Sequence, residues 1–360
     1  PPEKGEAVLY AELEKLAREG PSARELEKAK NGIVSTVVRS LKTINGKASL
    51  LADAELFFGG WRELPELMAA IQAVTAEDVK RVAAQTFTRR NRTVVTLEVP
   101  EAATTSTAAA VTETHEADEG EREAEDAKPK AEPRPLPALP AALPGKGGQV
   151  RLPQTVDFTL PNGLRVFLVP DRDVPVVSLQ ARGGGGGLED PAGKEGATAL
   201  LATLLGKGAG ERDAVVFQEA VDFVGGLFGT VAGTRWLEVQ AEFLSKDKDL
   251  ALELVADALT RPRLDPAELE KEKGKARDAI AAAREEPSQI IGRYFGAWLF
   301  QGHAFARPAG GDERSLDRIT LDDVKAAAAR TLAPGRTWLA VAGDFDPAEM
   351  CEAIEARLRA

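Results

Sequence analysis

The chain repeats part of its own sequence, and this repeat constrains its fold more than any other feature. Residues 75–80 (TAEDVK) recur as residues 320–325 (TLDDVK), and residues 25–30 (ELEKAK) recur as residues 268–273 (ELEKEK). The two offsets are 245 residues (320 − 75) and 243 residues (268 − 25). Two matches in the same order at nearly equal offset predict one architecture that is used twice.

The first copy, residues 1–100, has the pattern of several helices followed by one strand. Ser22 and Glu25 form a capping box, and Thr75 is a typical helix N-cap. From apolar spacing and these caps we expect helices over residues 7–18, 23–58 and 76–86 and a strand over residues 92–99. The first copy lacks the strands that precede the helices of the second, so we expect it to be the C-terminal end of a first unit.

The next stretch, residues 101–150, has a different composition. It is rich in Ala, Glu, Thr and Pro, and it carries ten acidic and five basic residues, about half of the net charge of −11. Such a stretch buries too little apolar surface to fold alone, so we expect a linker that is acidic first and stiffened by proline later. A regulatory or partner-docking motif within it is the alternative.

Residues 151–360 combine strands and helices in one α+β unit. The turn Pro161-Asn162-Gly163 predicts a hairpin between the first two strands. We expect strands over residues 156–160, 164–169, 176–181, 227–231, 236–243 and 337–341. We expect helices over residues 196–208, 248–259, 266–284, 320–331 and 348–358. The sequence therefore predicts a mixed, mostly antiparallel sheet covered by helices.

Composition narrows the classes of function. The net charge of −11 argues against nucleic acid or an anionic membrane as the main partner, and no apolar run is long enough to span a membrane. The only histidines are His115 and His303, so one helix cannot carry a two-histidine metal site. The single cysteine, Cys351, excludes an internal disulfide and a cysteine-rich zinc module.

Several ordered motifs of the second copy resemble the M16 (pitrilysin/insulinase) family of zinc peptidases. They are LPNGLRV at residues 160–166, the Gly-rich run before Glu189-Asp190-Pro191, GGL at residues 225–227, and GDFD at residues 343–346. The resemblance covers nearly everything outside the linker. It implies the family's α/β roll of the LuxS/MPP-like type, present in repeated form.

The zinc motif of that family is missing from this chain. Active members carry His-x-x-Glu-His on the helix that begins here at Gly196, where two histidines bind zinc and the glutamate acts on the bound water. The matching residues are Ala199, Ala202 and Thr203. The third ligand of the family follows seven residues after a glutamate that matches Glu272, which places it at Ala279. The resemblance therefore implies that this segment neither binds zinc nor catalyses.

One further motif points to peptide binding. Gly225-Gly226-Leu227 resembles the family's turn into its substrate-binding edge strand, so residues Leu227, Phe228, Gly229, Thr230 and Val231 could pair with a peptide by strand addition. The alternative is an ordinary strand of the sheet with no ligand.

Four other features of the sequence are better explained by structural roles than by binding or catalysis. The run Gly183–Gly187 lacks the ending of a phosphate loop and is typical of a flexible strand exit. His303 has no neighbouring ligand residues, so we expect it to be structural. We expect Glu285 and Glu286 to be solvated at a helix end, and we do not expect Cys351 to act as a nucleophile.

These observations lead to one hypothesis and one rival. We expect a non-catalytic segment of an M16 peptidase that forms a chamber wall and contributes to peptide binding, with zinc held in another domain or a partner subunit. The rival is a structural or assembly subunit that kept the fold and lost proteolysis, and an enzyme with unrelated chemistry is a third class. The resemblance also suggests the periplasm or cell envelope.

Overall fold

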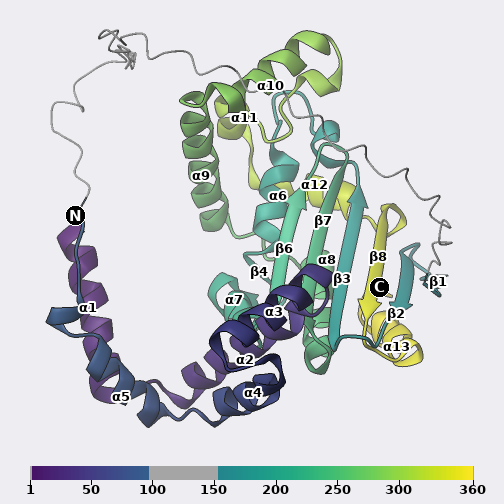
Figure 1. Ribbon diagram of the computed structural model, residues 1–360. Coiled ribbons are helices and arrows are strands. Elements are labelled where there is room, and N and C mark those ends of the chain that lie inside the picture. Colours follow the sequence, from purple (N-terminus) through teal and green to yellow (C-terminus); the bar gives the residue numbers. More distant parts are fainter. Residues whose placement is uncertain (1, 97–152, 360) are drawn as a thin grey trace, which may run out of the picture.

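The computed structural model describes residues 2–96 and 153–359 of the chain (Figure 1). The first part is helical. Its helices are α1 (Pro2–Glu19), α2 (Ala23–Ser40), α3 (Ile44–Phe57), α4 (Leu64–Ala73) and α5 (Ala76–Thr86), with short 3-10 turns η1 (Trp61–Glu63) and η2 (Arg89–Asn91). The linker expected over residues 101–150 lies outside the described residues.

The second part is built on a six-stranded sheet. Its strands are β1 (Val156–Thr159), β2 (Arg165–Pro170), β3 (Val176–Gly184), β6 (Leu227–Ala232), β7 (Trp236–Leu244) and β8 (Thr337–Gly343), in the spatial order β1-β2-β8-β3-β7-β6. Only β2 and β8 pair in parallel. A separate two-residue pair joins β4 (Gly208–Ala209) and β5 (Arg212–Asp213). The mixed, mostly antiparallel sheet is confirmed.

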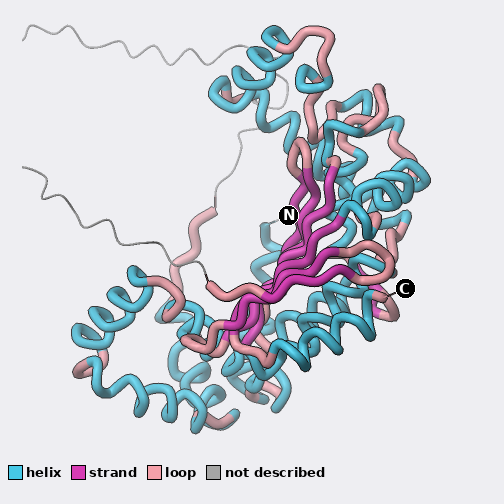
Figure 2. Tube along the Cα trace, turned by 90° about the vertical axis from the view of Figure 1, so that its right-hand side faces the viewer, coloured by secondary structure: helices cyan, strands magenta, loops and turns pink. Residues whose placement is uncertain are grey.

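On one face of this sheet, here called the open face, Lys42 of the first part contacts Ser178 and Glu242. The other face is covered by helices of the second part. They are α6 (Ala197–Leu205), α7 (Ala214–Phe223), α8 (Lys248–Thr260), α9 (Pro266–Arg284), α10 (Pro287–Leu299), α11 (Glu313–Arg318), α12 (Leu321–Thr331) and α13 (Pro347–Leu358), with short 3-10 turns between some of them. The side view shows the strands as one twisted layer (Figure 2). None of the helices in the described residues is long and apolar enough to cross a membrane.

Alternation along the strands explains the two faces of the sheet. The side chains on the covered face are almost fully buried and are Val166, Leu168, Val177, Leu179, Ala181, Leu237, Val239, Ala241, Phe243, Leu339 and Val341. On the other face β3 and β7 present polar side chains, and Gln180 opposite Gln240 is exposed. A period of two residues with one apolar face is what a half-covered sheet requires.

Two expectations about the first copy are corrected. The helical stretch over residues 23–58 is interrupted, because Thr43 caps a new helix by accepting a hydrogen bond from the Gly46 amide. The described part of the expected strand, residues 92–96, is not in a strand, and residues 97–99 lie outside the described residues. A strand needs a neighbour to pair with, and no strand is assigned within residues 2–96.

The helices of the first part recur in the second at the offsets seen in the sequence. The starts of α2 and α9 differ by 243 residues (266 − 23), as do those of α3 and α10 (287 − 44), and those of α5 and α12 differ by 245 (321 − 76). Thr75 and Thr320 close matching capping boxes with Asp78 and Asp323. The repeat therefore extends from two short motifs to a whole series of helices.

Candidate functional site

The residues that match the family's zinc motif lie on helix α6. Ala202 is 3% exposed and belongs to the hydrophobic core, whereas Ala199 and Thr203 are half-buried on the same helix. The Thr203 hydroxyl donates a hydrogen bond to the Ala199 carbonyl at 3.2 Å. Its hydroxyl is thus already bonded to the helix backbone, and two methyl groups stand where active members have a ligand and a base.

Helix α9, which packs beside α6, supplies no replacement ligand. Glu272 is buried and forms ion pairs with Lys207 at 3.6 Å and Lys275 at 2.7 Å. Ala279 lies about two turns further along the same face of α9 and is exposed. The donor set at the matching positions therefore does not fit zinc. Within residues 2–96 and 153–359, no three His, Cys, Asp or Glu side chains are grouped as metal ligands.

A buried carboxylate fixes the start of α6. Asp190, 1% exposed, accepts hydrogen bonds from the amides of Gly196 (3.2 Å) and Thr198 (3.1 Å) and from the Thr198 hydroxyl (2.6 Å). Arg330 of α12 donates to the same carboxylate at 2.9 Å. An anion at a helix N-terminus satisfies free amides and interacts favourably with the helix dipole. Asp190 is part of a motif noted in the sequence, but Arg330 had no sequence signal.

The strand β6 forms one outer edge of the sheet. The Gly233 amide bonds to the Trp236 carbonyl at 2.8 Å, so alternation of the antiparallel ladder turns the backbone groups of Leu227, Gly229 and Val231 toward β7. The amides and carbonyls of Phe228, Thr230 and Ala232 consequently point outward. No strand pairs with this edge in the described part of the chain.

A hollow of about 380 Å³ lies on the open face of the sheet beside β6. Its lining includes Leu227, Gly229, Gln240, Gln180 and Glu242. The Gln240 side chain leans over Gly229, where a Cβ atom would come within 3.1 Å of its amide nitrogen. An exposed backbone edge next to a hollow lined by both apolar and polar side chains suits the binding of an extended peptide by strand addition.

The remaining sequence candidates have structural roles. His303 begins a 3-10 turn, Ala304–Ala306, and its Nδ1 accepts a hydrogen bond from the Phe305 amide at 3.2 Å. The Gly-rich run is the exit of β3, as expected, and it is closely packed, because Gly186 is buried and a Cβ atom there would lie 2.4 Å from the Trp236 backbone nitrogen. Glu285 and Glu286 are exposed, as expected.

Cys351 lies half-buried on α13, where burial first and the Glu355 carboxylate second raise the pKa of its thiol. Because only the thiolate reacts, we expect Cys351 in the folded chain to react with Ellman's reagent more slowly than free cysteine at pH 7.5. The variant Glu355→Gln should react several-fold faster, since it removes a charge that disfavours the thiolate. A rate for the original chain equal to that of free cysteine would contradict this assignment.

Comparison with known proteins identifies the second part of the chain. Residues 171–313 match the family model described as insulinase (peptidase family M16). These residues are therefore similar to the M16 peptidases. An uncharacterised zinc protease of Mycobacterium leprae is 32% identical over 192 residues, which cover 53% of this chain and 43% of that protein. A second uncharacterised zinc protease, from Streptomyces coelicolor, is 26% identical over 198 residues, which cover 55% of this chain and 43% of that protein. The matched M16 region thus spans less than half of these relatives.

Solved structures share the M16 fold. A peptidase M16 inactive domain from Pseudomonas fluorescens matches with a TM-score of 0.54 and 23% identity, over 57% of this chain and 50% of that one. A protease from Helicobacter pylori matches with a TM-score of 0.55 and 21% identity, over 58% of this chain and 51% of that one. The expected fold class, the M16-type α+β roll, is confirmed.

Proposed function

We propose that this chain is a non-catalytic segment of an M16 peptidase, which walls a substrate chamber and binds extended peptide along β6. The proposal rests on two features that occur together: β6 has an open edge, and α6 lacks the residues of the family's zinc motif. Residues Leu227 to Val231 offer backbone partners for a peptide, whereas Ala199, Ala202, Thr203 and Ala279 offer no metal ligand. The zinc chemistry would then sit in another M16 domain or subunit.

The relatives support this division of roles. Those similar to the second part are named zinc proteases, and a structure of the same fold is named an inactive domain. A chain that resembles both, and whose motif positions carry methyl groups, fits a half that binds substrate without cutting it. The periplasm or cell envelope stays a suggestion from resemblance.

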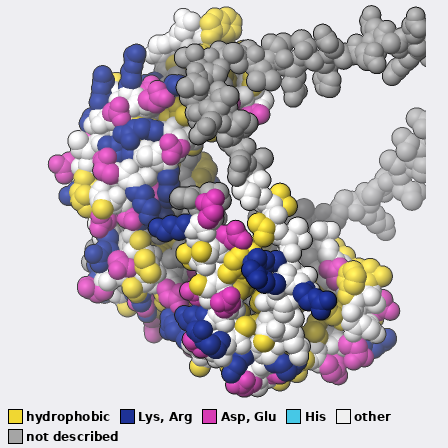
Figure 3. Space-filling model, turned by 90° about the vertical axis from the view of Figure 1, so that its left-hand side faces the viewer, with side chains coloured by type: hydrophobic (Ala, Val, Ile, Leu, Met, Phe, Trp, Pro, Cys, Tyr) yellow, Lys and Arg dark blue, Asp and Glu magenta, His cyan; other side chains and the backbone are white. Residues whose placement is uncertain are grey.

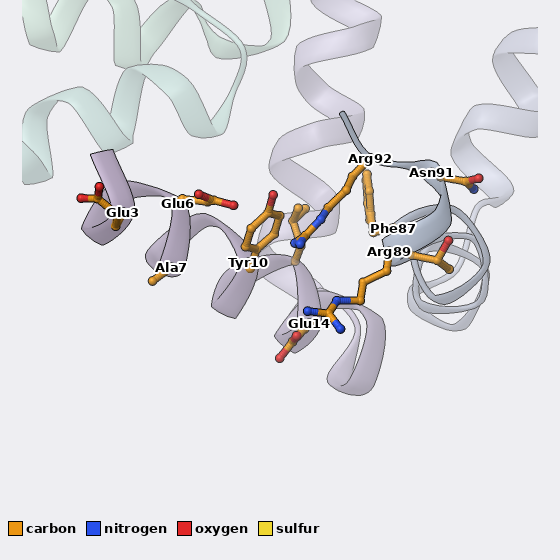
Figure 4. Close-up of a pocket in the computed structure, with 11 residues that line it drawn as sticks. Glu3, Glu6, Ala7, Tyr10, Glu14, Phe87, Arg89, Asn91 and Arg92 are labelled. Carbon is orange, nitrogen blue, oxygen red and sulfur yellow. The ribbon is translucent and has the colours of Figure 1, made fainter. Parts of the chain in front are cut away.

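The first part of the chain has the surface expected of an incomplete unit. A hollow of about 560 Å³ opens between α1 and the end of α5, where Arg92 stacks on Tyr10 at 4.4 Å and Phe87 is half exposed (Figure 4). The corresponding hollow of the second part is lined by Asn162 and Leu164 of the β1–β2 hairpin and by Leu358 of α13. We therefore propose residues 1–100 as the C-terminal end of a first M16-like unit and residues 151–360 as the first half of a second, joined by a linker.

A second candidate function is a structural subunit of a larger assembly, and the surface of α10 favours it. Its large side chains are unusually exposed, with Tyr294 at 71%, Trp298 at 66% and Ile291 at 66%. Apolar patches of this kind mark protein interfaces. Hydrophobic groups also lie among charged side chains on the face seen in Figure 3. Stable co-purification with a large complex that lacks peptidase activity would favour this candidate over the first.

The variant Thr230→Pro tests peptide binding at the β6 edge. It removes an amide that points outward, while the ladder to β7 uses the neighbouring residues, so the fold should persist. Losing one backbone hydrogen bond and adding a ring at the edge should weaken the binding of a fluorescent extended peptide about tenfold or more, measured by anisotropy.

The matched control is Thr230→Ala, which alters the same side chain and keeps the amide. It should bind peptide within about twofold of the original chain, since strand addition uses the backbone. If the original chain, Thr230→Pro and Thr230→Ala bind the peptide with equal affinity, the peptide binds at a site other than the β6 edge. If the original chain binds no peptide, the proposal is wrong.

A further inference from the structure

Helix α2 of the first part contacts the backbone immediately before the edge strand β6. Three side chains spaced four residues apart on α2 each donate to one of three successive carbonyls. Asn31 bonds to the Phe223 carbonyl at 2.9 Å, Ser35 bonds to the Val224 carbonyl at 3.3 Å, and Arg39 bonds to the Gly225 carbonyl. The i, i+4, i+8 spacing places all three donors on one helix face.

This contact is closely packed. Ser35 is fully buried, and Gly225 adopts a φ of 65°, which glycine tolerates best. A Cβ atom at Gly225 would lie 2.8 Å from the Asn31 carbonyl oxygen and 2.9 Å from the Ser35 hydroxyl. The turn from α7 into β6 can therefore approach α2 only because it has glycine there.

Charges flank the three hydrogen bonds on both sides. At one end Lys28 pairs with Glu219 at 2.8 Å and Asp222 at 3.4 Å, and its hydrogen bond lowers the pKa of the Glu219 carboxyl. At the other end Arg39 lies 3.4 Å from Glu242, the residue of β7 that pairs with Leu227. The Lys28 pairs are more than a third exposed at their acidic partners and contribute little on their own, whereas Arg39 and Glu242 are mostly buried. The three carbonyl hydrogen bonds and the Arg39–Glu242 pair therefore carry the specificity of this contact.

We infer that α2 positions the peptide-binding edge: Asn31, Ser35 and Arg39 are positioning residues that hold the three carbonyls preceding β6 in place. The inference rests on the proposed function, because it assigns these residues to the same strand edge. It links two parts of the chain that are far apart in sequence. A displacement of the N-terminal helices would free the turn and loosen the first residues of β6, so peptide affinity would depend on where those helices lie.

The test uses the full chain with the double variant Asn31→Ala/Arg39→Met and two readouts. Hydrogen–deuterium exchange of residues 226–232 should be at least about tenfold faster, while exchange in β3 and β8 stays unchanged, since the variant removes two of the three carbonyl hydrogen bonds and the Arg39–Glu242 ion pair. Affinity for the fluorescent peptide should fall by about tenfold as well, because a loosened strand must be ordered on binding.

The matched control is Arg24→Gln/Lys28→Gln, which removes charges from the same helix face but leaves the three carbonyl contacts. It should change neither readout by more than about twofold. Unchanged exchange of residues 226–232 in the first variant would overturn the inference, and so would faster exchange with unaltered peptide affinity.

The two proposals fail in different ways. If the original chain binds no peptide but the variant still exchanges faster at residues 226–232, the peptide-binding role is removed and positioning of β6 by α2 stands. If Asn31→Ala/Arg39→Met does not fold, Ser35→Ala provides the same exchange test with one donor removed, and a several-fold effect is expected.

Discussion

The variant Asp190→Ala is expected to destabilise the chain by about 3–5 kcal/mol. It removes the acceptor of the Gly196 and Thr198 amides and of the Thr198 hydroxyl, and it removes the buried partner of Arg330. Among the described residues Arg330 keeps only Glu189, at 3.6 Å, as an ion-pair partner, and buried donors that lose a charged acceptor are costly because their hydration is not restored. Urea unfolding followed by circular dichroism measures the change directly.

The control for this prediction is Asp322→Ala, in the first turn of α12. Its side chain is 93% exposed and lies 3.7 Å from Lys325, so the substitution should cost less than about 1 kcal/mol. If Asp190→Ala were as mild as its control, Asp190 could not be the anchor of α6, and the start of that helix would have to be held by other contacts.

Restoring the family's glutamate by Ala202→Glu should also destabilise the chain strongly, by at least about 3 kcal/mol. Ala202 is 3% exposed in a packed core, so the new carboxylate would be both buried without a partner and too large for its site. In the proposed alignment Ala202 takes the place of the family's catalytic base, and its packing in the core leaves no room for a carboxylate.

The matched variant Ala279→Glu places the same residue at the other vacated carboxylate position. Ala279 is exposed, and Glu is a good helix former, so urea unfolding should give a change below about 0.5 kcal/mol. An Ala202→Glu protein as stable as the Ala279→Glu protein would show that the α6 site is open to water, which contradicts the core packing described above.

Local patterns in the sequence were sufficient for much of the fold. The hairpin at Pro161-Asn162-Gly163 joins β1 to β2 as expected, since its turn residues fit few other conformations. The capping box at Ser22 and the N-cap at Thr75 form as their spacing predicts, and the N-cap at Thr75 is part of a box with Asp78. Helices α4, α7, α10 and α11 were not anticipated, although proline near the start of α4 and α10 was an available signal.

The sequence by itself determined the repeat and the α+β class, because both depend on residue type and spacing along the chain. Resemblance also suggested an edge strand over residues 227–231, but only the tertiary structure placed it there: β8 inserts between β2 and β3, and β6 has no outer partner in the described part of the chain. The Asp190–Arg330 pair and the Ser35–Val224 contact join residues 140 and 189 positions apart. Such contacts depend on how the chain closes on itself, and periodicity and caps carry no information about that.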